Sequence, residues 1–193
     1  MKMKRTALTT ALITTLLAAA GLASATTYNI DPSHTYPSFE ADHKGMSLWR
    51  GKFNSSKGTI TLDRAAKTGS LDIEIDINSI DFGHDGMNGH AKKADIFDAE
   101  KFPTATYKSK SFRFEGDRLV GVDGELTLHG VTKPVQLKVD RFKCEQNARL
   151  KREVCGANAT ADFNRADFGI TFGLPAFAPE VKLAIQVEAI ATE

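Results

Sequence analysis

The chain has 193 residues and carries 25 Lys and Arg against 24 Asp and Glu, a formal net charge of +1. Because the lysines are interleaved with acidic residues, the sequence offers no basic stripe for a phosphate backbone, and we expect no nucleic-acid partner. The length is that of about one domain after any targeting segment is removed.

Residues 1–25 are typical of a secretory signal peptide. Three basic residues within the first five precede an uncharged stretch, and Ala-Ser-Ala at 23–25 suits signal peptidase. A membrane anchor is the alternative, but the apolar part is short and rich in Ala and Thr for a span of about 20 residues. Cleavage after Ala25 would leave 168 of the 193 residues and remove three basic and no acidic residues, so the net charge would change from +1 to −2. We predict export, one domain over residues 26–193 and no stable membrane insertion.

Short segments with an apolar residue at every second place open the mature chain. Tyr28–Asp31 and Tyr36–His43 are expected to be strands, the second with Phe39 on its apolar side. Arg50–Ser55 and Gly58–Asp63 are expected to pair as a hairpin.

Leu71–Ile77 alternates most clearly. Its apolar face consists of Leu71, Ile73, Ile75 and Ile77, and its polar face of Asp72, Glu74 and Asp76. The three carboxylates could form an acid and base pair or a calcium site, but a strand with one wet face needs polar residues at these places. We interpret them as a solvated face.

Ile80–Pro103 interrupts the strand pattern and contains a helix-compatible run from about His90 to Phe97. A connection longer than about 12 to 15 residues is usually a functional lid or a disordered segment. This one is too apolar to float free, so we predict a lid over one end of the sheet structure. Its apolar residues are Met87, Ile96, Phe97 and Phe102.

The second half of the chain predicts longer strands. Thr104–Glu115 carries Phe112 and Phe114 in phase, and Arg118–Leu128 leads into the hairpin Gly124–Val139, which turns near Gly130. Two further strands should run into Cys144 and out of Cys155, and Pro179–Ala189 should form the last one. The apolar positions of the hairpin and of the last strand are Leu126, Leu128, Val135, Leu137, Val139, Val181, Leu183, Ile185 and Val187.

Cys144 and Cys155 are the only two cysteines. In an exported protein thiols oxidise, so we expect one disulfide, although a catalytic thiol is the alternative. His84, His90 and Asp85 could supply half of a metal site, but their spacing matches no zinc motif, and we expect no metal or other cofactor. The sequence contains no GxSxG, HExxH, CxxC or phosphate-binding glycine loop, and we expect no catalytic residues.

About eight strands at short spacing, each with one apolar face, indicate an antiparallel barrel or a sandwich. An eight-stranded barrel is either packed solid or holds one small ligand. The strand after Cys155 has small residues on one face, at Ala157, Ala159 and Ala161, and these would leave room inside.

The mature chain resembles the YceI-like family, also described as periplasmic polyisoprenoid-binding proteins. The resemblance covers six motifs in order, besides Phe39 and His43: YNIDPSHT at 28–35, RGKF at 50–53, DIFDAEKFP at 95–103, LTLHGVTKPV at 126–135, NRADFG at 164–169 and VKL at 181–183. It implies an all-β, eight-stranded, lipocalin-like antiparallel barrel in the periplasm, with an apolar channel for an isoprenoid lipid or a quinone tail.

On this basis we expect a non-enzymatic carrier or storage protein. Its channel would be lined by Phe39, Ile73, Ile75, Ile77, Phe112, Phe114, Leu126, Leu128, Leu137, Val139, Leu183 and Ile185. The alternatives are an exported stress-response or quinone-associated enzyme and a solid-core module that binds another protein at an edge strand. A homodimer is compatible with the sequence.

Overall fold

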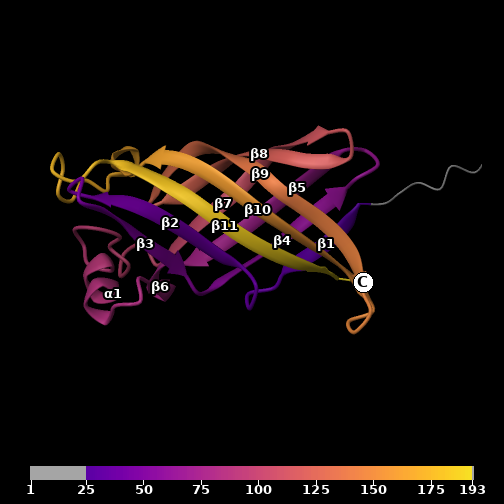
Figure 1. Cartoon of the computed structure of the whole chain (residues 1–193), viewed down its shortest axis with the longest axis horizontal. Coiled ribbons are helices and arrows are strands. Elements are labelled where there is room, and N and C mark those ends of the chain that lie inside the picture. The colour runs from indigo at the N-terminus through magenta and orange to yellow at the C-terminus, as the bar shows by residue number, and fades with distance from the viewer. Residues whose placement is uncertain (1–24, 193) are drawn as a thin grey trace, which may run out of the picture.

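The computed structural model describes residues 25–192, and strands dominate them (Figure 1). The strands are β1 Thr26–Ile30, β2 Tyr36–His43, β3 Ser47–Phe53, β4 Ser56–Asp63, β5 Thr68–Asp76, β6 Ile80–Asp81, β7 Thr104–Glu115, β8 Arg118–Leu128, β9 Val131–Asn147, β10 Arg152–Asn164 and β11 Glu180–Ala191. The helices are the α-helix α1 Asp85–Ala91 and the 3₁₀ turns η1 Ile77–Ser79 and η2 Arg165–Phe168. The expected signal peptide lies outside the described residues, apart from Ala25.

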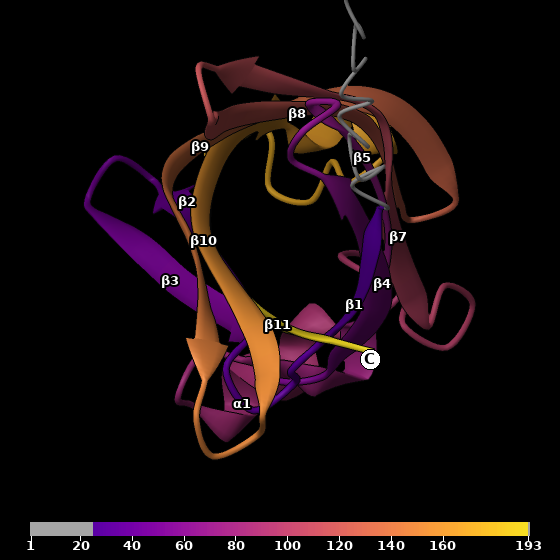
Figure 2. The same cartoon turned by 90° about the vertical axis from the view of Figure 1, so that its right-hand side faces the viewer.

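Eight of these strands close into an antiparallel barrel, which Figure 2 shows from one end. The order is β1, β4, β5, β7, β8, β9, β10 and β11, and the ring closes where β1 pairs with β11, with Tyr28 opposite Ala191. The other half of β11 pairs with β2, where Val181 lies opposite Ala41, and β3 and β6 follow outward. The predicted eight-stranded antiparallel barrel is confirmed.

Strand β5 shows why these sequences form a barrel. Ile73 and Ile75 point inward, while Glu74 pairs with Lys57 at 3.0 Å and Asp72 pairs with Lys108 at 2.9 Å on the outside. Both carboxylates pair with lysines of neighbouring strands, as the solvated-face interpretation expects.

The hairpin β8–β9 also forms as predicted. Leu128 lies opposite Val131, and His129 and Gly130 make the two-residue turn with φ values of 51° and 76°. Positive φ at both turn residues matches the right-handed twist of the flanking strands. A Cβ on Gly130 would lie 2.5 Å from the ring of Phe102, so the turn also needs glycine for space.

The predicted hairpin between residues 50–55 and 58–63 is wrong. β3 pairs with β2 and β6, whereas β4 pairs with β1 and β5. The residues between them are held by Ser79, which accepts from the Asn54 amide at 3.1 Å through its carbonyl and from the Ser55 amide at 3.0 Å through its hydroxyl. Residues 54 and 55 therefore connect β3, which lies outside the closed ring, to β4 within it. The alternation of apolar residues does not specify which strand is the partner.

The helix of the lid segment begins earlier than predicted. α1 covers Asp85–Ala91, because the His84 side chain accepts from the Met87 amide at 3.2 Å and caps the first turn. Asp85 lies in that first turn, where a negative charge is favourable. Two glycines that suggested a loop lie inside the helix, and after Ala91 the chain continues as turns. None of the helices within residues 25–192 is long and apolar enough to cross a membrane.

Candidate ligand-binding cavity

The barrel encloses a cavity of about 550 Å³. This volume lies within the range of about 300 to 1,000 Å³ that small-molecule sites occupy. Eleven of the twelve residues predicted to line a channel lie on its wall: Phe39, Ile73, Ile75, Ile77, Phe112, Leu126, Leu128, Leu137, Val139, Leu183 and Ile185. Their contact with a ligand stays a prediction.

Phe114 does not lie on the cavity wall. The pairing of β7 with β8 shifts register between Arg113 and Phe114, so the alternation that places Phe112 inside does not continue to Phe114. The Phe114 ring packs instead against the buried clusters of the barrel.

The lid segment covers one end of the cavity. Met87, Ile96 and Phe97 lie on the cavity wall, and Phe97 meets Phe53 edge to face with ring centroids 6.0 Å apart. Phe102 lies elsewhere, against the ring of His129 at 4.6 Å. Three of the four lid residues therefore lie on the wall, and the fourth packs the lid onto the β8–β9 turn.

A group of aromatic residues at the lid end, which we call the mouth cluster, was not predicted. It consists of Trp49, His43, Phe177, Phe172 and His90, all of which lie on the cavity wall. His43 stacks on Trp49 at 5.0 Å and meets Phe177 at 5.3 Å, while His90 meets Phe172 at 5.2 Å. The signal that could have revealed it is the stretch 171–179, which has two phenylalanines and no charged residue.

The cavity wall reaches the molecular surface at the mouth cluster, beside the lid, and buried side chains line the other end, which we call the far end. Phe172 is 40% exposed, whereas Tyr28 and Leu62 on the far wall are 2% and 5% exposed. Tyr28 donates to Glu153 at 2.5 Å, and Arg64 donates to the same carboxylate at 2.6 Å. Burial, and then the hydrogen bond to Glu153, raise the pKa of Tyr28 to about 12. These three residues link β1, β10 and the β4–β5 turn at the far end of the barrel.

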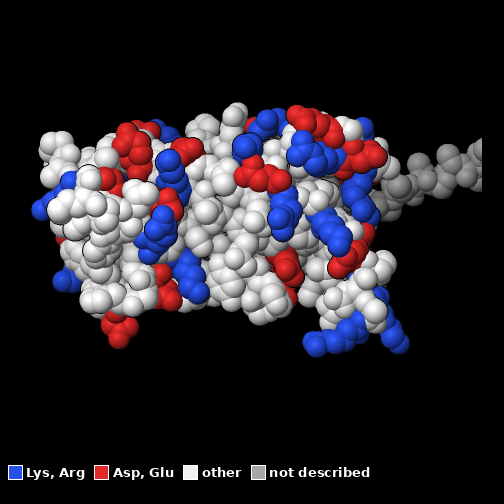
Figure 3. All heavy atoms as spheres, in the orientation of Figure 1, with Lys and Arg blue, Asp and Glu red and all other residues white. Residues whose placement is uncertain are grey.

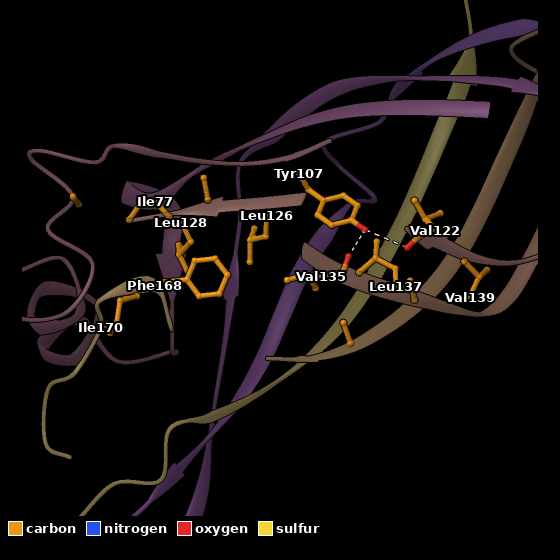
Figure 4. Close-up of a cluster of buried hydrophobic side chains, with 14 of the residues drawn as sticks. Ile77, Tyr107, Val122, Leu126, Leu128, Val135, Leu137, Val139, Phe168 and Ile170 are labelled. Carbon is orange, nitrogen blue, oxygen red and sulfur yellow. Dashed lines mark hydrogen bonds between the residues drawn. The ribbon is translucent and has the colours of Figure 1, made fainter. Parts of the chain in front are cut away.

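Tyr107 is a buried polar side chain that lies among apolar ones (Figure 4). Its hydroxyl donates to the Val135 carbonyl at 2.7 Å and also lies 3.3 Å from the Val122 carbonyl. Burial, and then the nearby Asp123 carboxylate, raise its pKa above the usual range. The hydroxyl therefore stays protonated and already has protein partners.

Arg165 holds the loop beside the mouth. Its guanidinium donates to the carbonyls of Ile170 at 2.8 Å and Phe177 at 3.3 Å. Burial lowers the pKa of Arg165 from its ordinary value. These hydrogen bonds hold the backbone of residues 170–177 against the barrel.

Asp31, Ser33 and His34 lie within hydrogen-bond distance but do not form a catalytic relay. Both Asp31, at 2.8 Å, and Ser33, at 3.1 Å, meet Nδ1 of His34, whereas a relay needs the two ring nitrogens to serve different partners. The hydrogen bonds from Ser33 and His34 lower the pKa of Asp31, and the bond to Asp31 raises the pKa of His34. The three side chains form an exposed hydrogen-bonded group that stabilises the turn after β1.

The residues considered for a metal site and for a catalytic thiol have structural roles instead. His84 caps α1 and His90 packs on Phe172, and no group of three or more His, Cys, Asp or Glu side chains within residues 25–192 could hold a metal ion. Cys144 and Cys155 lie directly opposite each other on β9 and β10 and form the predicted disulfide. The disulfide is confirmed, and the catalytic-thiol alternative is wrong.

Residues 28–189 match the model of the YceI-like domain. Protein YceI of Salmonella arizonae is 34% identical over 181 residues, which cover 92% of this chain and 94% of the relative, and Protein YceI of Salmonella heidelberg matches equally well.

Solved structures share the fold. Burkholderia cenocepacia BcnA superposes with a TM-score of 0.70 at 22% identity, covering 82% of this chain and 98% of BcnA. A polyisoprenoid binding domain from Saccharophagus degradans, implicated in plant cell wall breakdown, gives a TM-score of 0.62 at 20% identity, covering 85% and 98% of the two chains. Taken with the family match over residues 28–189, the closed barrel and its motifs show that the chain belongs to the YceI-like family.

Proposed function

We propose that the protein binds the isoprenoid chain of a polyprenyl lipid or quinone in the barrel cavity and serves as a periplasmic carrier or storage protein. The observation that carries this proposal is the apolar cavity wall, on which the hydroxyls of Tyr28 and Tyr107 and the guanidinium of Arg165 are bonded to protein groups. A chain that enters this space gains about 0.8 kcal/mol for each methylene removed from water.

Two further observations support the ligand class and the compartment. The chain belongs to the YceI-like family, and one structural neighbour is a polyisoprenoid binding domain. The predicted signal peptide and the disulfide both suit an oxidising compartment outside the cytoplasm.

The role is non-enzymatic. Catalysis on a quinone would need an acid, base or nucleophile directed into the cavity. Tyr107 and Arg165 on the inner wall are instead bonded within the protein, His43 and His90 pack against aromatic rings at the mouth, and the Ser33, His34 and Asp31 group lies outside the cavity lining.

The test is to identify what the exported protein carries. The protein is purified from a periplasmic extract without detergent, and native mass spectrometry is compared with an analysis of an organic-solvent extract. We expect a prenyl-chain species at near-equimolar yield. A straight fatty acyl chain at that yield would overturn the isoprenoid assignment, and protein free of lipid that also fails to take up added polyprenol would overturn the carrier.

A further inference from the structure

We propose that the mouth end of the barrel docks on the surface of a bilayer that contains anionic lipids, so that the ligand passes between membrane and cavity without crossing water. The inference rests on the proposed function, because a water-insoluble ligand has to be collected from a membrane or delivered to one. The docking proposal goes beyond the carrier proposal, because it assigns an interaction surface and a membrane partner that the cavity does not specify.

The exposed apolar side chains gather at this end. Among residues 25–192, three large apolar side chains are exposed: Met46 at 73%, Leu48 at 50% and Phe172 at 40%. Met46 and Leu48 belong to the tip of the β2–β3 hairpin, and Phe172 belongs to the loop between η2 and β11. Figure 1 shows the tip and the loop side by side at the left end of the barrel.

The two segments form one surface. The Ala178 amide donates to Asp42 at 3.4 Å, the ring of His43 meets Phe177, and the Lys44 ammonium lies 5.4 Å from the centre of the same Phe177 ring. We call residues 44–48 and 171–178 the docking face. Because Phe172 and Phe177 also lie on the cavity wall, the docking face borders the cavity at the mouth cluster.

The charge of the docking face suits an anionic lipid surface. Residues 171–178 contain no charged side chain, and Lys44 is the only charged residue in residues 44–48. The structure gives no ion pair for Lys44 within the described part of the chain, and the nearby Asp42 carboxylate accepts from the Gly45 and Ala178 amides. The cation is therefore available for a lipid phosphate.

The opposite end differs in character. There the turns carry the ion pairs of Arg64 with Glu153 and of Arg118 with Glu115, at 2.6 Å and 2.9 Å, and the β9–β10 turn adds the exposed basic residues Arg149 and Lys151. None of the exposed large apolar side chains of residues 25–192 lies at that end. In Figure 3 both signs of charge crowd the right-hand end, whereas white spheres make up most of the far left end. Contiguous exposed apolar groups mark an interaction site, and apolar side chains beside a lysine are typical of segments that lie in a membrane interface.

The test uses sedimentation with vesicles of phosphatidylcholine, with and without phosphatidylglycerol. We expect the protein to bind the anionic vesicles, and Lys44→Glu to weaken this binding about thirtyfold, since each cation near such a surface is worth about 1 kcal/mol and the reversal both removes a positive charge and adds a negative one. The matched control is Lys151→Glu in the β9–β10 turn at the opposite end. Both lysines are exposed turn residues with positive φ, 56° and 54°, so the substitutions are structurally alike.

Two further variants probe the apolar part. Met46→Ser and Leu48→Ser should each weaken binding to anionic vesicles, and neither residue lies on the cavity wall. Their uptake of polyprenol in detergent-free solution should remain unchanged, as should that of Lys44→Glu. This second measurement separates the carrier proposal from the docking proposal. If the unaltered protein takes up no polyprenol, the carrier proposal fails, whereas the docking proposal is judged by vesicle binding alone.

Three results would overturn docking. The first is a protein that takes up polyprenol but does not sediment with anionic vesicles. The second is equal weakening by Lys44→Glu and Lys151→Glu. The third is a dimer in solution that Met46→Ser converts to a monomer, because a second copy of the chain would then cover the docking face.

Discussion

The hydroxyl of Tyr107 donates to the carbonyl of Val135, 2.7 Å away, from a strand that is not its neighbour. Tyr107 belongs to β7 and Val135 to β9, and the ring crosses β8 at Gly124, where a Cβ would lie 2.6 Å from the ring. A glycine on the middle strand thus lets one side chain link three strands inside the barrel wall.

Tyr107→Phe should therefore lower the free energy of unfolding by about 1 kcal/mol, because the buried carbonyls lose their donor while the ring remains. Urea unfolding measures the change. The control is Tyr36→Phe, which removes an exposed hydroxyl that donates to the Ser33 carbonyl at 2.9 Å and should cost less. Equal losses in the two variants would show that the link across β8 adds no stability.

The disulfide should stabilise the fold without being required for it. Cys144 and Cys155 are 11 positions apart, and closing a loop of this length is worth about 3 kcal/mol in the chain-entropy model. We expect the Cys144→Ser, Cys155→Ser double variant to unfold at lower urea concentration and still to show the circular dichroism of a folded barrel. An unfolded double variant, or one as stable as the parent, would contradict this.

Alkaline pH should destabilise the far end of the barrel through Tyr28. Its pKa is raised from 10.0 to about 12 in the folded protein, so the folded state holds this proton more tightly than the unfolded state does. The stabilisation is fully present below pH 10 and is lost as the pH rises from about 10 to about 12. Urea unfolding across this window should show a smaller decline for Tyr28→Phe than for the parent, and parallel declines would contradict the assignment.

Much of the barrel could be predicted from local patterns. Alternation places Ile73 and Ile75 inside, and a glycine at 130 indicates the β8–β9 turn, because both effects depend on neighbours in the sequence. Alternation does not identify the partner strand, which is why β3 and β4 were wrongly paired. It also fails across a register shift, which is why Phe114 was expected on the channel wall.

The mouth cluster could not be predicted in this way. Trp49 and Phe177 are far apart in the chain and meet His43 only because β11 pairs with β2 and brings the preceding loop against the β2–β3 hairpin. The start of α1 was missed because Gly86 and Gly89 favour a loop, whereas the His84 side chain caps the first turn and favours the helix. The mouth cluster therefore depends on tertiary contacts, whereas the cap of α1 is local and is not apparent from the residue type.

An open cavity and a solid core respond differently to added bulk. Ile75→Trp should reduce polyprenol uptake and leave the stability of the ligand-free protein nearly unchanged, because the larger ring enters space that the ligand would occupy. Overpacking of a solid core would instead cost about 1 to 3 kcal/mol. The matched control is Glu74→Gln on the outer face of β5, where the carboxylate pairs with Lys57 at the surface. Lost uptake in Glu74→Gln would overturn the assignment of the two faces.

The most direct test of the carrier uses Trp49, the single tryptophan, which lies on the cavity wall at the mouth. Lipid-free protein is titrated with an isoprenoid quinone while the Trp49 fluorescence is followed. If the chain fills the cavity and leaves its ring at the mouth, quenching should saturate at equimolar quinone and be reversed by a polyprenol that has no quinone ring. Quenching that rises without saturation, or that polyprenol does not reverse, would contradict binding of an isoprenoid chain inside the barrel.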